Sequence, residues 1–197
     1  MAFRRYRAGK SLSRQNRDKV DDCSTEETPR IEKKTLLSRE DRRDKTFSLA
    51  LRILAARPRS ENQLRERLMS KAWADEELVE ECIARLKELG YINDRSFAEN
   101  YANHRLQMRP AGRSRIRQEL SRKEVSRETI DEALDAVFEE KPEESLIDRA
   151  IEKRIRLQGR PRTPQESKKL FDHLLRRGFD YSLIIRKLRN IGSTEEE

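Results

Sequence analysis

The chain has 197 residues, of which 42% are charged and only 34% are hydrophobic, and its formal net charge is +8. This composition argues against one thick hydrophobic core and favours thin helical units that each bury a narrow apolar stripe. No apolar run approaches the roughly 18 residues that a membrane span needs, so no membrane contact is expected, and the excess of bases points to an acidic partner, either nucleic acid or an acidic protein groove.

The first segment, residues 1–43, is polar and has no sustained apolar periodicity, which predicts a disordered basic tail. Its first twenty residues hold seven bases and a single acid, Asp18. Such a run suits either a solubilising tail or an accessory electrostatic arm, and both interpretations stay open. No apolar stretch follows the basic start, so a signal peptide is not expected.

The next segment, residues 44–92, has the apolar spacing of three successive helices. The first helix should stop at Pro58. Ser60 then begins the second helix, with Gln63 at the position that completes a capping box. Asp75 is expected to cap the third helix.

One pattern of apolar and basic residues occurs three times. Counted from Leu64, it has apolar residues at +4, +9, +14 and +18 and a base at +7, and it recurs without a gap from Ile116 and from Leu170. This spacing indicates an internal repeat of about fifty residues, each copy a three-helix unit. The apolar residues at +9 are Trp73, Val125 and Phe179. We expect them to be core residues that close the end of the second helix.

Residues 93–140 form the second predicted unit and residues 141–192 the third, followed by an acidic end at residues 193–197. Asp94 is expected to cap the first helix of the second unit. Thr163 opens the sequence TPQE, a strong start signal for the second helix of the third unit. Nothing alternates with the period of a strand. The predicted fold is therefore all-α, an elongated array of three tandem three-helix repeats behind a disordered basic N-terminal tail.

The chain offers no catalytic constellation. His104 and His173 lie among charged residues, and both are predicted to be isolated surface histidines. Cys23 and Cys82 have neither a metal-binding nor a redox spacing, which suits a reducing cytoplasm, and Cys82 occupies a core position. Phosphate-binding loops are also missing from the sequence. We therefore expect no enzymatic activity, no cofactor and no bound metal.

Charge is distributed unevenly along the chain. Residues 1–43 hold 13 bases and 8 acids, residues 44–146 hold 19 and 21, and residues 147–190 hold 13 and 5. In the third unit, bases recur at i, i+4, i+7 and i+11, which places them on one helix face: Arg149, Lys153, Arg156 and Arg160. Like charges on one face repel by a few tenths of a kcal/mol per pair. A polyanion or acidic surface explains such a stripe better than solubility does.

Further bases extend this candidate contact surface. In the third unit they are Arg162, Lys168, Lys169, Arg176 and Arg177. In the second unit they are Arg113, Arg115 and Arg117. Only Phe171 is aromatic within the basic stretch of the third unit, so stacking of single-stranded bases on it is not indicated.

The chain over residues 46–191 resembles the RecX family of bacterial recombination regulators. The most specific stretch is GYINDRSFAENY, residues 90–101, preceded by LAARPRSENQLRERL and followed by RPAGRSRIRQEL. The resemblance implies a protein that binds the RecA–DNA filament in its helical groove and inhibits its ATPase and strand exchange. It also implies four candidate surface contacts: Arg57 and Arg59 within the first of these motifs, and Gly112 and Arg113 within the last.

One position departs from the family pattern. Many relatives carry glycine after the base that ends the second helix, as Gly178 does here, whereas the first two copies have Ala72 and Glu124. A left-handed helix end is less favourable for those residues than for glycine.

The leading hypothesis is therefore a regulator of the RecA filament that binds the recombinase, the DNA within the filament and, as a further ligand, free DNA. A general DNA-binding protein or transcription regulator that uses the same basic surface is the alternative. A helical scaffold for an acidic protein is a third, weaker hypothesis. We expect a monomer, because each copy has neighbours that cover its apolar face.

Overall fold

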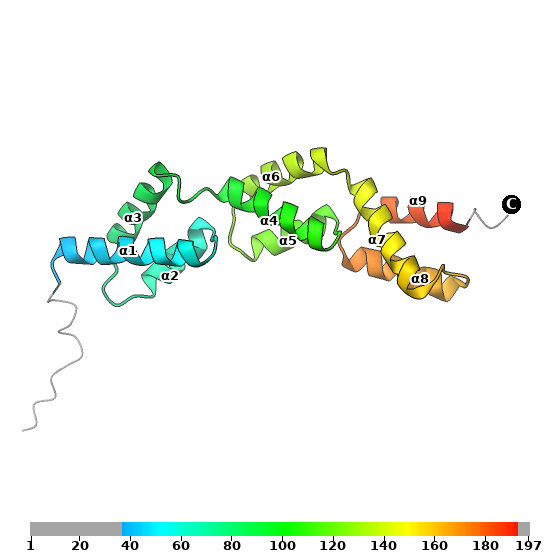
Figure 1. Ribbon diagram of the computed structural model, residues 1–197, viewed down its shortest axis with the longest axis horizontal. Helices are drawn as coiled ribbons and strands as arrows, with labels where there is room; N and C mark the ends of the chain where they lie inside the picture. Colours follow the sequence, from blue (N-terminus) through cyan, green and yellow to red (C-terminus); the bar gives the residue numbers. More distant parts are fainter. Residues whose placement is uncertain (1–36, 193–197) are drawn as a thin grey trace, which may run out of the picture.

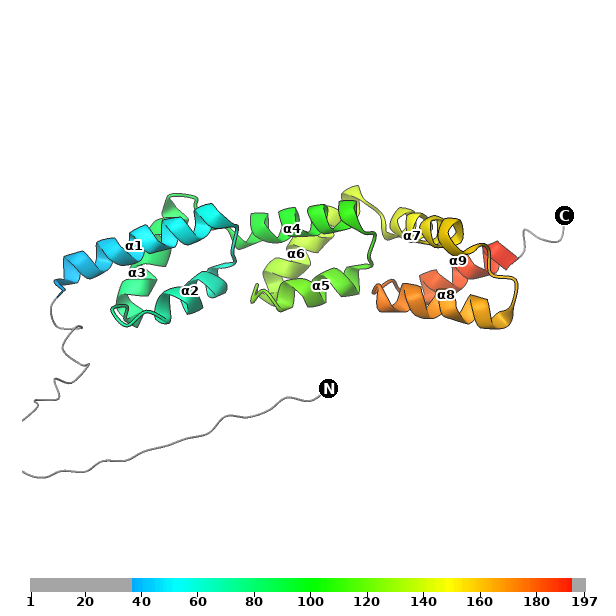
Figure 2. The same cartoon turned by 60° about the horizontal axis from the view of Figure 1, so that its bottom comes forward.

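The computed structural model describes residues 37–192, and over that range it consists of nine α-helices without a strand. Figure 1 shows the helices in three successive groups along one long axis, and Figure 2 shows the same order after a 60° turn. The predicted all-α, elongated array of three three-helix repeats is confirmed. Residues 1–36 and 193–197, which include most of the predicted tail and the acidic end, lie outside the described residues.

Each repeat contains three consecutive helices. The first repeat contains α1 (Arg39–Ala56), α2 (Glu61–Met69) and α3 (Glu76–Glu88). The second contains α4 (Asp94–Met108), α5 (Arg113–Ser121) and α6 (Arg127–Glu140). The third contains α7 (Glu143–Gln158), α8 (Pro164–Arg176) and α9 (Tyr181–Gly192). The closest helix packing is within repeats, as between α4 and α6 or α1 and α3.

Helix α1 begins at Arg39, inside the segment predicted to be tail and five residues before the predicted start. Ser38 and Asp41 form a capping box that satisfies the first N–H groups of the helix. The guanidinium of Arg39 then pairs with Glu77 on α3 at 2.7 Å. This first turn has few apolar residues, so its helical start depends on capping and on ion pairs with a distant segment, which periodicity cannot detect.

The buried residues form two separate cores. One core belongs to the first repeat and includes Leu64, Leu68 and Leu86. The other is continuous through the second and third repeats, from Ala98 to Ile184. The first repeat is therefore joined to the rest by polar contacts more than by shared apolar packing.

The residues predicted to close the second helices do enter the cores. Val125 and Phe179 are buried, and Trp73 is half-buried against the core of the first repeat, with the Nζ of Lys45 4.1 Å from its ring centroid. Cys82 is also buried, and burial raises the pKa of its thiol to about 11. This thiol is therefore a core group and not a reactive nucleophile.

Candidate nucleic-acid and filament interface

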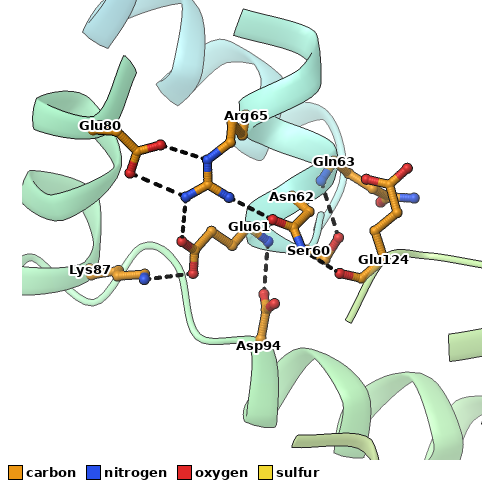
Figure 3. Close-up of polar contacts among 9 residues, drawn as sticks. All are labelled: Ser60, Glu61, Asn62, Gln63, Arg65, Glu80, Lys87, Asp94 and Glu124. Atoms are coloured by element: carbon orange, nitrogen blue, oxygen red, sulfur yellow. Dashed lines mark hydrogen bonds and ion pairs between the residues drawn. The ribbon is translucent and has the colours of Figure 1, made fainter. Parts of the chain in front are cut away.

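The start of α2 is held against the end of α5 in the next repeat (Figure 3). The Ser60 hydroxyl donates a hydrogen bond to the carbonyl oxygen of Lys123 and accepts one from Gln63 N–H at 3.3 Å. The Asn62 amide donates to the carbonyl oxygen of Glu124 at 2.7 Å. Only half of the predicted Ser60–Gln63 capping box is present: the Ser60 hydroxyl accepts from Gln63 N–H, but the Gln63 side chain does not accept from Ser60 N–H.

The sequence predicts that Asp94 caps α4, but the structure shows otherwise. Asn93 is the N-cap, and its side chain accepts from Ser96 N–H at 2.9 Å. The carboxylate of Asp94 instead accepts from Glu61 N–H at 2.8 Å, at the first turn of α2 (Figure 3). The Glu61 N–H lies in the first turn of α2 and has no acceptor inside that helix. The following repeat thus supplies its acceptor.

The junction between the second and third repeats has the same arrangement. Gly112 N–H donates to the carbonyl oxygen of Arg177 at 2.9 Å, whereas at the first junction the Ser60 hydroxyl donates to the equivalent carbonyl oxygen of Lys123. Arg113 N–H donates to the carboxylate of Glu143, the first residue of α7, at 3.1 Å. Asp94 and Glu143 therefore hold equivalent positions 49 residues apart.

Burial affects both of these carboxylates in the same way. It raises the pKa of Asp94 and of Glu143 above the ordinary value, and the hydrogen bond from the backbone N–H of the preceding repeat opposes that effect. Each acid is a partly buried acceptor that joins two consecutive repeats.

Close backbone contact distinguishes the second junction. A Cβ on Gly112 would lie 2.0 Å from the carbonyl oxygen of Gly178, and one on Gly178 would lie 2.4 Å from Arg115 N. Gly178 also has a φ of +78°. Glycine is required at both positions, and the third repeat can sit this close to the second only because neither residue has a side chain.

The predicted basic residues of the second repeat are committed to internal ion pairs. Arg113 pairs with Asp135, and Arg117 donates to Asp131 through Nε at 2.9 Å and Nη2 at 2.6 Å. These contacts bind α5 to α6. The arginines expected to contribute to a contact surface thus pair with carboxylates of the neighbouring helix.

The third predicted base of α5, Arg115, belongs to a cluster around Glu119. Arg115 Nε, Arg105 Nε and the Tyr101 hydroxyl donate to its two oxygens at 2.9, 3.0 and 3.0 Å. The hydrogen bond from Arg105 is the largest favourable contribution, and together these donors hold the pKa of Glu119 below its usual value although burial opposes them. This cluster ties α4 to α5.

The basic residues of the third repeat are arranged differently. Six are exposed and have no ion pair or side-chain hydrogen bond within residues 37–192: Arg149, Lys153, Arg156, Arg160, Lys168 and Arg176. Arg162 and Lys169 are exposed and lie near Glu166, whose pKa is lowered first by the backbone N–H of Arg162 and further by these two charges. We refer to these eight residues as the third-repeat basic surface. They supply positive charge that the described part of the chain does not neutralise with ion pairs.

Arg177, another predicted contact residue, is half-buried and makes a hydrogen bond between repeats. Its Nη1 donates to the carbonyl oxygen of Pro110 at 2.6 Å across the second junction. Burial lowers its pKa, and the nearby charges of Arg109 and Arg154 lower it further. Sequence reasoning missed Arg109 and Arg154, because only the fold brings the end of α4 close to α7 and α8.

His173 differs from the predicted isolated surface histidine. It is half-buried, and burial lowers its pKa, as do the charges of Arg177, Arg154 and Arg176. The imidazole is therefore held in its neutral form within a group of arginines. His104 is exposed, as predicted.

Arg57 and Arg59 lie on either side of Pro58 in the link between α1 and α2. Arg57 is exposed, whereas Arg59 is half-buried and its Nε has no hydrogen-bond partner. Both border pockets at the first junction. Within residues 37–192 no group of His, Cys, Asp and Glu could hold a metal ion, and no helix there is long and apolar enough to cross a bilayer.

Comparison with known proteins shows which family has these repeats. Residues 47–86, 93–134 and 143–188 match the first, second and third three-helix domains of RecX, in that order. The chain belongs to the RecX family. It is 37% identical over 154 residues to the regulatory protein RecX of Deinococcus radiodurans, covering 78% of this chain and 72% of that protein.

Other RecX proteins support the same assignment. The regulatory protein RecX of Chlorobium phaeobacteroides is 33% identical over 147 residues, covering 75% of this chain and 93% of that protein. The crystal structure of RecX from Lactobacillus salivarius shares the fold of this RecX-family chain, with a TM-score of 0.69 at 24% identity over 78% of this chain and 98% of that one.

Proposed function

We propose that this chain binds the filament of a RecA recombinase on DNA and inhibits its ATPase, its extension and strand exchange. The match of three consecutive domains to RecX, a family of regulatory proteins, supports this proposal most strongly. The long, narrow array of helices suits attachment along an extended groove (Figure 1).

The third-repeat basic surface is the proposed attachment site. Its exposed charges lack ion pairs within the described residues, so an incoming polyanion need not displace an internal carboxylate. Phosphate groups and acidic side chains are both suitable ligands for exposed Lys and Arg. The paired arginines of α5 instead maintain the shape of the second repeat.

The proposal is tested by the DNA-dependent ATPase of the cognate recombinase. We expect inhibition by the wild-type chain, and weaker inhibition after the combined change Arg149→Glu, Lys153→Glu and Arg156→Glu. A control with the same change of charge in the first repeat, Arg43→Glu, Arg52→Glu and Arg67→Glu, should remain potent. Equal potency of the two variants at moderate salt would remove the third-repeat basic surface from the mechanism.

The alternative is a general DNA-binding protein or transcription regulator. Salt dependence alone does not separate the two, because phosphate contacts give a steep dependence in both cases. The alternative predicts equal occupancy of bare DNA and of recombinase-coated DNA, whereas the filament proposal predicts a preference for the coated form. Sedimentation of the chain with each form measures this difference.

A further inference from the structure

A pocket of about 440 Å³ opens at the junction between the first two repeats. Its volume is in the range of about 300–1,000 Å³ that is typical of ligand sites. It lies where the two hydrophobic cores are separate, between the link that follows α1, the side of α4 and the end of α5. The packing of the repeats thus leaves a cavity that neither core fills.

Two aromatic rings from α4 line this pocket. Phe97 and Tyr101 lie one turn apart with ring centroids 6.5 Å apart and planes 24° from parallel. The Tyr101 hydroxyl donates to Glu119 at 3.0 Å, which fixes the orientation of the ring. Both rings are partly exposed, so an incoming planar group can pack on them.

The pocket has positive charge and no acid. Lys123 Nζ lies 4.8 Å from the centroid of the Tyr101 ring, and Arg57 is exposed at the rim. Neither side chain has an ion pair within the described residues. No carboxylate lines this pocket, whereas each of the other four surface pockets described has at least one acidic residue in its lining. The expected ligand therefore combines a flat ring with negative charge.

The register of the repeats relates this pocket to part of the third-repeat basic surface. Asp94 and Glu143 are equivalent, so the same offset of 49 residues relates Asn100 in the pocket to Arg149. It also relates His104 to Lys153. Figure 2 shows α4 and α7 following one another along one edge of the array.

We propose that this pocket binds one unstacked nucleotide of single-stranded DNA. Its base packs on Phe97 and Tyr101, and the adjoining phosphates lie on Arg57 and Lys123. Stacking on aromatic side chains beside a basic track is the usual means by which proteins hold single strands without sequence preference. The inference rests on the proposed function, because the DNA within the filament is the intended occupant.

An acidic peptide is the competing occupant, and the amides in the pocket favour the nucleotide. Gln63 and Asn100 each present a donor and an acceptor. A base edge offers both kinds of partner to these amides, and its flat face matches the two rings. An acidic side chain offers acceptors alone and has no flat face that could stack on Phe97.

The test uses the full chain without recombinase and two fluorescent probes of about 20 nucleotides, long enough for several stacking sites. One probe is oligothymidylate and the other is an abasic chain of the same length. We expect at least fivefold tighter binding of oligothymidylate, because stacking of one base is worth about 1–3 kcal/mol. Phe97→Leu should abolish that preference. Phe138→Leu, which removes an aromatic ring that packs against the core outside the pocket, should retain it.

A second experiment uses only the wild-type protein, so its result does not depend on whether a variant folds. Photo-crosslinking of wild-type protein to oligothymidylate, followed by trypsin, should attach DNA to the peptide of residues 96–105, which contains both rings. Equal affinity for the two probes, or crosslinks only elsewhere, would overturn the inference. So would tighter binding of thymidine monophosphate, or of an acidic peptide, than of oligothymidylate.

These results are independent of the ATPase assay. If the chain inhibits the recombinase but shows no preference for bases, the proposed function stands and the pocket proposal fails. If the chain binds bases at Phe97 but leaves the recombinase unaffected, the pocket stands as a DNA site and the proposed regulatory role fails.

Discussion

Glu124 holds in the second repeat the position that Gly178 holds in the third, and both have a positive φ, of 63° and 78° respectively. Glu124 is the only non-glycine residue with positive φ within residues 37–192. A side chain in this region costs roughly 1–2 kcal/mol. The carbonyl oxygen of Glu124 accepts from Asn62 in the first repeat, so the junction keeps this conformation in place.

Glu124→Gly should therefore stabilise the protein. We expect a gain of about 0.5–1 kcal/mol in the free energy of unfolding, because glycine reaches positive φ without strain but loses more entropy on folding. Urea denaturation measures it. Glu139→Gly, an exposed change in the last turn of α6, is the matched control and should lower stability by less than about 1 kcal/mol, the cost of glycine in a helix interior. A loss of stability in both variants would contradict the strain at Glu124.

Gly112→Ala should disrupt the second junction, because the new Cβ would meet the backbone of Gly178. We expect a loss of about 3 kcal/mol, at the high end for overpacking. Hydrogen exchange should show the loss of protection at the contact between α5 and α8. Gly90→Ala is the comparison: its φ is +72° but nothing lies within 4 Å, so strain alone should cost about 1 kcal/mol. Similar losses in the two variants would show that the close contact is unimportant.

Asp94 is expected to act as a hydrogen-bond acceptor more than as a charge. Asp94→Asn keeps an oxygen for Glu61 N–H and removes the cost of burying a carboxylate, so the stability at neutral pH should change by less than about 0.5 kcal/mol. Asp94→Ala leaves that donor without its partner and should cost about 1–2 kcal/mol. Thermal denaturation of the two variants distinguishes these outcomes, and equal losses would assign the role to charge.

His173 should make stability depend on pH. Its pKa is lowered in the folded chain, so the unfolded chain takes up a proton first as the pH falls. The contribution of the neutral imidazole is complete above the unfolded pKa of about 6.5 and is lost as the pH falls through the folded pKa. His173→Gln should therefore lose less stability than wild type between about pH 7.5 and 5.5. Denaturation at each pH measures the stability of both proteins, and equal losses in the two would contradict this prediction.

Much of the fold could be predicted from sequence because apolar spacing reports helix faces directly. Leu64, Ile116 and Leu170 recur at the same point of each repeat, and all three are buried. The start of α1 was missed because the ion pair that supports it joins Arg39 to Glu77, 38 residues away. Spacing shows which residues share a helix face, but not which distant residue that face meets.

The candidate contact surface shows more clearly that spacing does not reveal the distant partner of a residue. The stripe from Arg149 to Arg160 is exposed, as its spacing predicts. The spacing around Arg117 predicts an exposed base in the same way, yet Arg117 pairs with Asp131. The packing of α6 on α5 decides which bases are neutralised, and sequence spacing does not report that packing. Residues such as Arg57 and Phe97 line one pocket only because two repeats meet there, so sequence alone gave no sign of the pocket.

The most direct test of the regulatory role is the ATPase rate of the cognate recombinase on single-stranded DNA, with the full chain added at well below one molecule per recombinase. We predict inhibition at that ratio, because a protein that acts at filament ends or breaks need not coat the filament. An unchanged rate, even at equal concentrations of the two proteins, would contradict the account.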